Sequence, residues 1–434
     1  MGSLKQWRVM RAALTVVLAL SAPAFAQDVQ SAGVESAAGS PGRWLASWTS
    51  AQIAPGRNTI DALFGGDRSR ILDNQTVRNV VHISVGGRRV RVRFSNAFGT
   101  EALRIGAAQV ALRSSRSAIF PGSSRRLTFS GQASILVPAG ALAVSDPVDL
   151  EVSGAADLAV SVYLPSVTEA ATYHEQTGVT SYIAGPGNFV AATDVPVTEE
   201  TTATYYLSMV EVSPSDTIRA VVAFGDSITQ GFGSSPNQYR TWPDRLSVRL
   251  NPNPLRPRLA VVNQGVGCGR LLWDFCGPSG AARFERDVLT VPGASHVIVH
   301  LGLNDITIPS ILPNFDHPEF APEAVSAQEI IVGLHQLALR AHAQGLRIIG
   351  ATITPLGASA VPGVFTPENE AKRQAINRWI RTSGAFDGIV DFDAAVRDPA
   401  NPTRLLPAYD FDGLHLTDAG YQAMANAINL SLLF

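Results

Sequence analysis

The sequence has little cysteine, little charge and almost no long apolar run, and each shortage excludes a class of function. Its 434 residues include two cysteines, and no further ligands stand near them at the spacing of a zinc site. The formal net charge of −2 gives no general attraction to nucleic acid or to an anionic membrane. Beyond the N-terminal segment, no run approaches the roughly 18 apolar residues of a membrane span. We therefore expect no nucleic-acid partner, no metal site and no stable membrane insertion of the processed chain.

The N-terminus follows the pattern of a secretory signal peptide. Basic residues come first, then an apolar stretch, and then the small-residue cleavage pattern that ends at Ala26. We expect residues 1–26 to be removed, residues 27–40 to form a flexible leader, and the protein to be secreted or periplasmic. A membrane anchor is the alternative, although the apolar stretch is short for a bilayer. In an oxidising compartment Cys268 and Cys276, eight positions apart, are expected to form a disulfide.

Residues 41–212 have the period-two pattern of a β-rich domain. In residues 80–94 (VVHISVGGRRVRVRF) apolar positions alternate with polar ones on both sides of Gly86-Gly87, which predicts a β-hairpin with one buried face. Short strands separated by turn residues follow, and we interpret this half as an antiparallel β-sandwich of jelly-roll type. His82 and His174 have no evident partners and are expected in loops or at the sheet surface. Four arginines are expected to face either solvent or an acidic polysaccharide: Arg88, Arg89, Arg91 and Arg93.

Residues 213–434 have the pattern of an α/β domain. Five apolar runs without alternation, the first at residues 219–224, are separated by helical segments. They predict a parallel sheet with helices on both faces. Ser326 with Glu329 forms a capping box at the start of one helix, and Thr417 caps the last helix. Because such a sheet binds ligands beyond the carboxyl ends of its strands, a site is expected in the segments that follow the strands.

Four of these segments carry the groups that ester hydrolysis requires. The reaction needs a serine nucleophile, a histidine base, a carboxylate that orients the histidine, and donors for the negative oxygen of the tetrahedral intermediate. Ser227, His415 and Asp412 fit the first three needs, and Asp410 is an alternative to Asp412. Asn304 offers a side-chain N–H, and the glycine-rich loop 265–269 offers backbone N–H groups.

The same segments resemble a known family. They are, in order, the four sequence blocks of the SGNH hydrolases, or GDSL esterase/lipase superfamily: GDS at 225–227, the glycine-rich loop after Asn263, GLND at 302–305 and DGLH at 412–415. The resemblance covers about residues 213–434 and is to the secreted bacterial form with an N-terminal β-rich domain. It implies a flavodoxin-like three-layer fold and hydrolysis without a metal or other cofactor.

The resemblance also implies roles for the site residues. These are Ser227 as nucleophile, His415 as base, Asp412 as the group that orients His415, and Asn304 as an oxyanion donor beside the backbone N–H of Ser227. The family takes a further donor from a glycine five residues after the asparagine, and that position holds Cys268 in this chain. The donor is therefore expected to be the N–H of Cys268 or, with a local shift, that of Gly267.

We interpret the chain as a secreted serine esterase that removes acetyl or similar short acyl groups from carbohydrate. Export and the additional β-rich domain both suit an extracellular or polymeric substrate, such as an acetylated polysaccharide. The alternative is a lipase or arylesterase acting on lipidic or aryl esters, although the sequence contains no long apolar lid segment. A third hypothesis is a binding protein with an inactive hydrolase domain, against which the intact Ser227, Asn304, Asp412 and His415 argue.

Overall fold

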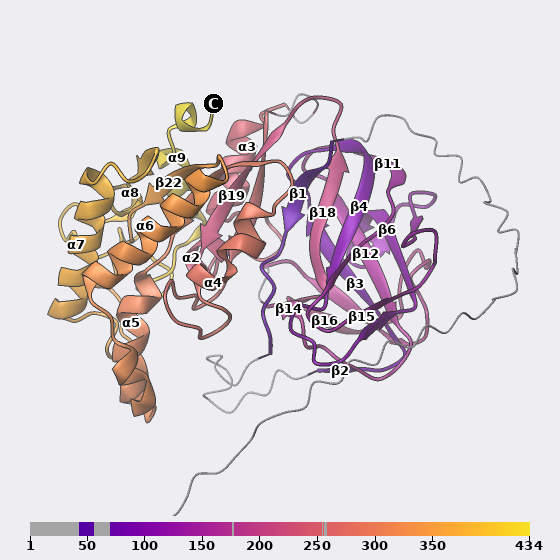
Figure 1. Cartoon of the computed structure of the whole chain (residues 1–434), viewed down its shortest axis with the longest axis horizontal. Coiled ribbons are helices and arrows are strands. Elements are labelled where there is room, and N and C mark those ends of the chain that lie inside the picture. The colour runs from indigo at the N-terminus through magenta and orange to yellow at the C-terminus, as the bar shows by residue number, and fades with distance from the viewer. Residues whose placement is uncertain (1–42, 56–69, 176–177, 254, 256–257) are drawn as a thin grey trace, which may run out of the picture. The chain divides into compact units, whose positions relative to one another are not determined.

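The two halves of the chain are built from different secondary structure (Figure 1). A computed structural model describes residues 43–55, 70–175, 178–253, 255 and 258–434. The expected signal peptide (1–26) and leader (27–40) lie outside the described residues. Among the described residues, no helix has both the length and the apolar character needed to cross a membrane.

The β-rich half contains two large antiparallel sheets that share one hydrophobic cluster. The five-stranded sheet consists of β1 (Leu45–Thr49), β18 (Leu207–Ser213), β4 (Gly87–Ser95), β10 (Leu142–Val144) and β11 (Val148–Val152). The seven-stranded sheet consists of β16 (Val197–Thr201), β15 (Ser181–Pro186), β3 (Gln75–His82), β12 (Asp157–Leu164), β6 (Ala107–Ser115), β7 (Ala118–Ile119) and β8 (Arg125–Leu127). Three short pairs complete it: β2 (Ile71–Leu72) with β13 (Thr168–Glu169), β14 (Tyr173–His174) with β17 (Thr204–Tyr205), and β5 (Leu103–Ile105) with β9 (Ile135–Val137).

The predicted hairpin at residues 80–94 is wrong, because its two strands lie in different sheets. β3 pairs with β12 and β15, whereas β4 pairs with β18, β10 and β11. The two glycines allow neighbouring backbone segments to lie close to this one. A Cβ at Gly86 would lie 2.2 Å from Val152 O, and a Cβ at Gly87 would lie 2.8 Å from Ser213 O. The buried face predicted within β4 is confirmed, since Val90, Val92 and Phe94 are buried.

The arginines of β4 are largely paired within the protein. Arg91 and Arg93 both bind the carboxylate of Glu211, whose side chain is fully buried, and Arg91 also lies over the Trp44 ring at 4.5 Å. Arg89 pairs with Asp149 at 3.3 Å. Two carboxylates therefore offset only part of the charge of the four arginines, and Arg88 and Arg89 are exposed on this strand.

The second half is organised around a five-stranded parallel sheet in the order β20-β19-β21-β22-β23. The strands are β19 (Arg219–Gly225), β20 (Leu259–Gly265), β21 (Ala294–His300), β22 (Arg347–Ala351) and β23 (Gly388–Val390). The chain passes from β19 to β20 on one side and then to β21 on the other, so the strand order reverses beside β19. A ligand site is expected at such a reversal.

Two groups of helices pack with this sheet. One group consists of α3 (Trp242–Leu250), α8 (Phe392–Val396) and α9 (Asp418–Ala427). The other consists of α4 (Gly280–Phe284), α5 (Leu303–Ile311), α6 (Ala327–Ala343) and α7 (Pro367–Thr382). Shorter helical segments are α2 (Ser227–Gln230), η1 (Glu285–Leu289), η2 (Leu312–Phe315), η3 (Pro318–Glu323) and η4 (Leu430–Leu433). The predicted capping box of Ser326 and Glu329 and the Thr417 cap are confirmed.

The two halves share their hydrophobic cores. The cluster around the parallel sheet includes Ala46 and Met209 of the β-rich half, and the β-rich cluster includes Ala220, Ala260 and Val266. The described residues from Arg43 to Phe434 accordingly form one compact unit. The change of strand pattern near residue 213 therefore marks a change of architecture without a break in packing.

Candidate active site

Ser227 lies on a tight turn between β19 and α2. Asp226 caps the helix, since its Oδ1 accepts the N–H of Ile228 at 3.0 Å. Gly225 must be glycine, because a Cβ there would lie 2.0 Å from Thr229 Oγ1 and 2.7 Å from His300 O. The turn thus holds Ser227 directly beyond the carboxyl end of the strand next to the reversal of strand order.

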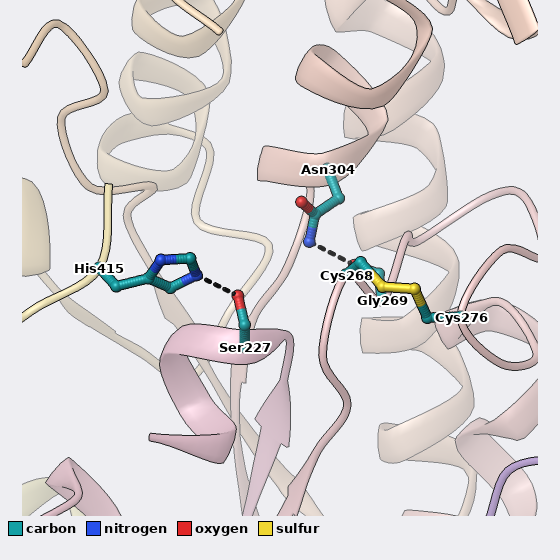
Figure 2. Close-up of a disulfide and its surroundings, with 6 residues drawn as sticks. All are labelled: Ser227, Cys268, Gly269, Cys276, Asn304 and His415. Carbon is teal, nitrogen blue, oxygen red and sulfur yellow. Dashed lines mark hydrogen bonds between the residues drawn. A yellow bond between two sulfur atoms is a disulfide. The ribbon is translucent and has the colours of Figure 1, made fainter. Parts of the chain in front are cut away.

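Three side chains form one hydrogen-bonded chain at this position. Ser227 Oγ lies 2.9 Å from His415 Nε2, and His415 Nδ1 lies 2.8 Å from Asp412 Oδ2 (Figure 2 shows Ser227 and His415). Asp412 Oδ1 also accepts the backbone N–H of His415 at 2.8 Å. Asp410, the alternative partner of the histidine, instead accepts the N–H of Gly413 at 2.5 Å. The geometry therefore brings together Ser227, His415 and Asp412.

The electrostatics of Asp412 fix the direction of these hydrogen bonds. Burial acts to raise the pKa of this carboxyl, but the hydrogen bond and charge of His415 outweigh it and lower the pKa to about 2. An ionised carboxylate only accepts hydrogen bonds, so His415 Nδ1 carries a proton. In the neutral ring Nε2 then has a lone pair that accepts the Ser227 hydroxyl proton.

The glycine-rich loop and Asn304 lie at the same edge (Figure 2). Asn304, in the first turn of α5, donates from Nδ2 to Gly269 O at 3.0 Å. Cys268 has a φ of 48°, in the left-handed region, and is joined by a disulfide to Cys276, with the two Cα atoms 5.7 Å apart. Gly267 lies against Gln230, because a Cβ there would be 3.0 Å from Gln230 Oε1.

Buried charged groups hold the segment that follows this loop. Asp305 accepts the backbone N–H groups of Leu271 at 2.6 Å and Leu272 at 2.9 Å. Burial raises the pKa of Asp305, and these N–H groups partly offset that effect. Arg270, fully buried, pairs with Glu323. Asp305 and Arg270 therefore have structural roles here.

Two exposed phenylalanines lie beside the histidine, and no sequence pattern predicts them. The Phe232 ring lies 4.6 Å from the His415 ring and 6.1 Å from the Phe411 ring, and the two residues are 39 % and 54 % exposed. A pocket of about 450 Å³ lies next to Phe411 and Asp412, and its lining does not include Phe232. Phe232 and Phe411 therefore form an exposed aromatic surface beside His415. Among the described residues, no group of His, Cys, Asp and Glu side chains has the arrangement of a metal site.

Asp226 gives a prediction about pH and stability. Burial raises its pKa to about 7, and among the described residues its Oδ2 has no hydrogen-bond partner. His300 Nδ1 is 3.8 Å from Asp226 Oδ1, but burial lowers the pKa of His300 to about 4, so that ring is neutral. A carboxyl whose pKa is higher in the folded state binds its proton more tightly there. Its contribution to stability is therefore lost as pH rises from about 4 to about 7.

We expect Asp226→Asn to remove this pH dependence while keeping the Oδ1 cap of α2. Between pH 5 and pH 8 the wild type should lose a few kcal/mol of unfolding free energy, on the order set by the raised pKa of Asp226, that the variant does not lose. Denaturant unfolding of both proteins at the two pH values measures it. A constant difference between variant and wild type would show that Asp226 ionises normally.

One protein-family model matches the part of the chain that contains these residues. The model of the GDSL-like Lipase/Acylhydrolase family matches residues 223–423, a span that includes Ser227, Asn304, Asp412 and His415. The chain therefore carries a GDSL-like lipase/acylhydrolase domain, which is an ester-hydrolysing enzyme domain. Preceding it is a β-rich region. The comparison with curated proteins gives no match.

Several solved structures are similar to about half of this chain. A carbohydrate acetylesterase from Sinorhizobium meliloti is 18 % identical, with 50 % of this chain and 100 % of that chain covered and a TM-score of 0.38. The aryl esterase of M. smegmatis is 16 % identical, with 48 % and 95 % covered and a TM-score of 0.37. A GDSL-like lipase from Bacteroides thetaiotaomicron VPI-5482 is 19 % identical, with 50 % and 88 % covered and a TM-score of 0.35.

Proposed function

We propose that the protein is an exported serine esterase that hydrolyses short-chain, acetyl-type esters carried on carbohydrate. Ser227 is the nucleophile, His415 is the general base and Asp412 orients His415. The observation that carries the proposal is the continuous hydrogen-bond chain from Asp412 through His415 to Ser227, at 2.8 Å and 2.9 Å. A serine hydroxyl is a weak nucleophile unless a base removes its proton, and this chain provides that base.

The reaction proceeds through an acyl-enzyme. Ser227 Oγ attacks the carbonyl carbon of the ester while its proton passes to His415 Nε2, and Asp412 stabilises the imidazolium. The tetrahedral intermediate then breaks its bond to the alcohol oxygen, which leaves with the proton from His415. Water attacks the acyl-enzyme as His415 takes one of its protons. Collapse of the second intermediate releases the carboxylic acid and restores the Ser227 hydroxyl.

Three N–H groups are available for the negative oxygen of these intermediates. They are the backbone N–H of Ser227, an N–H of the Asn304 amide, and the backbone N–H of Cys268 or Gly267. An amide nitrogen carries two hydrogens, so Asn304 can hold Gly269 O with one and donate the other to the substrate. Such donors act mainly in the transition state, where the charge is largest.

Two features support a carbohydrate ester as the substrate. The N-terminal pattern of a signal peptide and the β-rich half suit a polymeric substrate outside the cytoplasm. The exposed rings of Phe232 and Phe411, at 84° to each other beside His415, give an apolar surface against which a sugar ring can pack. The same rings would also suit an aryl ester, so an arylesterase or lipase acting on aryl or lipidic esters is the alternative.

A panel of substrates distinguishes these functions. We expect kcat/KM to be higher for acetyl esters than for octanoyl esters of the same alcohol, because the sequence has no long apolar lid to cover an extended acyl chain. We also expect acetate release from acetylated polysaccharides, measured by mass spectrometry. A steady rise of kcat/KM with acyl length would replace this proposal with the lipase alternative, and hydrolysis confined to aryl acetates would replace it with the arylesterase alternative.

The disulfide gives a further prediction. The Cys268–Cys276 bridge restrains the loop that carries the candidate oxyanion N–H groups, and Cys268 holds a left-handed backbone conformation. We expect Cys276→Ser, or reduction of the native protein, to lower kcat while changing KM little, because a displaced donor weakens transition-state binding more than substrate binding. Melting temperature measured on the same samples is the control. A lower melting temperature with wild-type kcat would assign the bridge to stability alone.

A further inference from the structure

The carboxamide of Gln230, in the helix α2 that begins at Ser227, lies between the glycine-rich loop and the β-rich half. Gln230 ends α2, three residues after Ser227. Its Nε2 donates to Glu175 O at 2.6 Å and lies 3.2 Å from His174 Nε2, and both of these residues belong to the β-rich half. On its other side, a Cβ at Gly267 would lie 3.0 Å from its Oε1, and a Cβ at Gly265 would lie 2.1 Å from its backbone N.

The direction of the hydrogen bond between His174 and Gln230 follows from the other nitrogen of the ring. His174 Nδ1 lies 2.6 Å from Ala51 O, and a carbonyl oxygen only accepts, so Nδ1 carries the proton. In the neutral ring Nε2 is then an acceptor for an N–H of Gln230. Burial lowers the pKa of His174 to about 4, which keeps the ring neutral at neutral pH. His174 is therefore a buried, hydrogen-bonded residue, and the expectation of a loop or surface position without partners is wrong.

The backbone around Gln230 connects these contacts to the site. Gln230 N donates to Asp226 O at 2.8 Å, which closes the turn that carries Ser227. Asn263, at the start of the glycine-rich segment, donates from Nδ2 to Thr229 O at 2.8 Å. A shift of Gln230 would therefore move both the nucleophile turn and its contact with the glycine-rich loop.

The β-rich half also contacts the segment between Val266 and Gly277, which begins within the glycine-rich loop and contains the disulfide. Val266 is part of the hydrophobic cluster of the β-rich half. A Cβ at Gly277, next to the disulfide, would lie 2.6 Å from Ile53 Cγ2. The loop between Val266 and Gly277 therefore packs on the β-rich half at both of its ends.

We infer that His174 and Gln230 are positioning residues, through which the β-rich half holds the nucleophile turn and the glycine-rich loop in their reactive arrangement. This inference rests on the proposed function. It gives the β-rich half a direct part in the hydrolase site, separate from any binding of carbohydrate. Misplacement of catalytic groups by about 1 Å costs roughly 100-fold in rate, so small displacements at Gln230 have measurable effects.

Two substitutions at His174 separate the hydrogen bond to Gln230 from the burial of the ring. His174→Asn keeps an N–H in the place of Nδ1, toward Ala51 O, and removes the acceptor for Gln230. His174→Gln instead places an amide oxygen where Nε2 accepts from Gln230. We expect kcat for p-nitrophenyl acetate to fall roughly 10- to 100-fold in His174→Asn with KM unchanged, and to recover largely in His174→Gln.

Ser247→Ala is the matched control, because Ser247 Oγ also bonds across the two halves, to Ser84 Oγ at 2.9 Å, but from α3. We expect wild-type kcat for this variant. Gln230→Met, which keeps the length of the side chain without its donors, tests the same contact from the other side. It should show the kcat loss of His174→Asn, so the test does not depend on one variant folding.

The outcomes separate this inference from the function on which it rests. If Ser227→Ala is inactive while folded His174→Asn or Gln230→Met turns over at the wild-type kcat, the inference is wrong and the proposed function stands. An equal kcat loss in Ser247→Ala also overturns it, because any weakening of contact between the halves would then suffice. Full turnover by Ser227→Ala would overturn both.

Discussion

Ser227→Ala is expected to lower kcat for ester hydrolysis by about 10⁶-fold, the cost typical of removing a serine nucleophile that acts with its base. The hydroxyl bonds to His415 Nε2 at 2.9 Å, and the turn that carries it is held by backbone bonds and by Asp226. The substitution should therefore leave the fold unchanged. Steady-state kinetics with p-nitrophenyl acetate and circular dichroism of the same preparation measure both effects.

Ser234→Ala is the control for this experiment. Ser234 lies on the segment that follows α2, and its hydroxyl donates to Gly231 O at 2.7 Å. We expect its kcat to remain within the range of the wild type. Substantial turnover by pure Ser227→Ala would contradict the assignment of the nucleophile.

Asp412→Asn is expected to lower kcat by about 10⁴-fold, the effect seen when the acid of a serine–histidine–aspartate triad becomes an amide. The asparagine amide group can donate toward His415 Nδ1, which favours the tautomer whose Nε2 carries the proton. That nitrogen can then no longer accept the proton of Ser227. Because the wild-type pKa of Asp412 is lowered to about 2, the wild-type carboxylate stays ionised throughout the pH range of such assays.

Asp410→Asn separates this effect from a general loss of charge. Asp410 lies two residues away and accepts the backbone N–H of Gly413, a bond that the amide oxygen of asparagine can also accept. We expect its kcat to stay within a few-fold of the wild type. Equal losses of kcat in Asp412→Asn and Asp410→Asn would show that the effect comes from the local negative charge and not from the hydrogen bond to His415.

The candidate site could be predicted from the sequence because parallel strands bring their carboxyl ends to the same edge of a sheet. The apolar runs ending near Phe224, Asn263 and Leu301 coincide with β19, β20 and β21, and the structure brings the segments after them to one place. Helix starts were also predictable, since the bonds of Ser326 with Glu329 and of Thr417 are local in sequence.

Contacts between residues distant in sequence could not be predicted in this way. The alternation at residues 80–94 shows which side chains of β4 are buried but not which strands pair, and the sheets depend on partners such as β12 and β18, more than 60 residues away along the chain. His174 was misplaced because its partners, Ala51 and Gln230, lie 123 and 56 positions away. The jelly-roll description of the β-rich half remains a prediction.

The aromatic surface beside His415 also could not be predicted, because no sequence pattern marks its residues. Phe232 and Phe411 are isolated in the sequence, and they meet because His415 and α2 are brought together by the sheet. An exposed phenylalanine outside a periodic segment is not distinguishable, in one sequence, from an ordinary surface residue.

The central claim, that Ser227 forms a covalent acyl-enzyme, is tested most directly by trapping with a fluorophosphonate ester followed by peptide mass spectrometry. The reagent phosphonylates an activated serine with loss of fluoride and imitates the tetrahedral intermediate. We predict one adduct per chain, on the peptide that contains Ser227, together with complete loss of esterase activity. We also predict no adduct in Ser227→Ala and slow labelling in Asp412→Asn. Activity that persists in the fully labelled protein, or an inactivating adduct on another residue, would contradict the account.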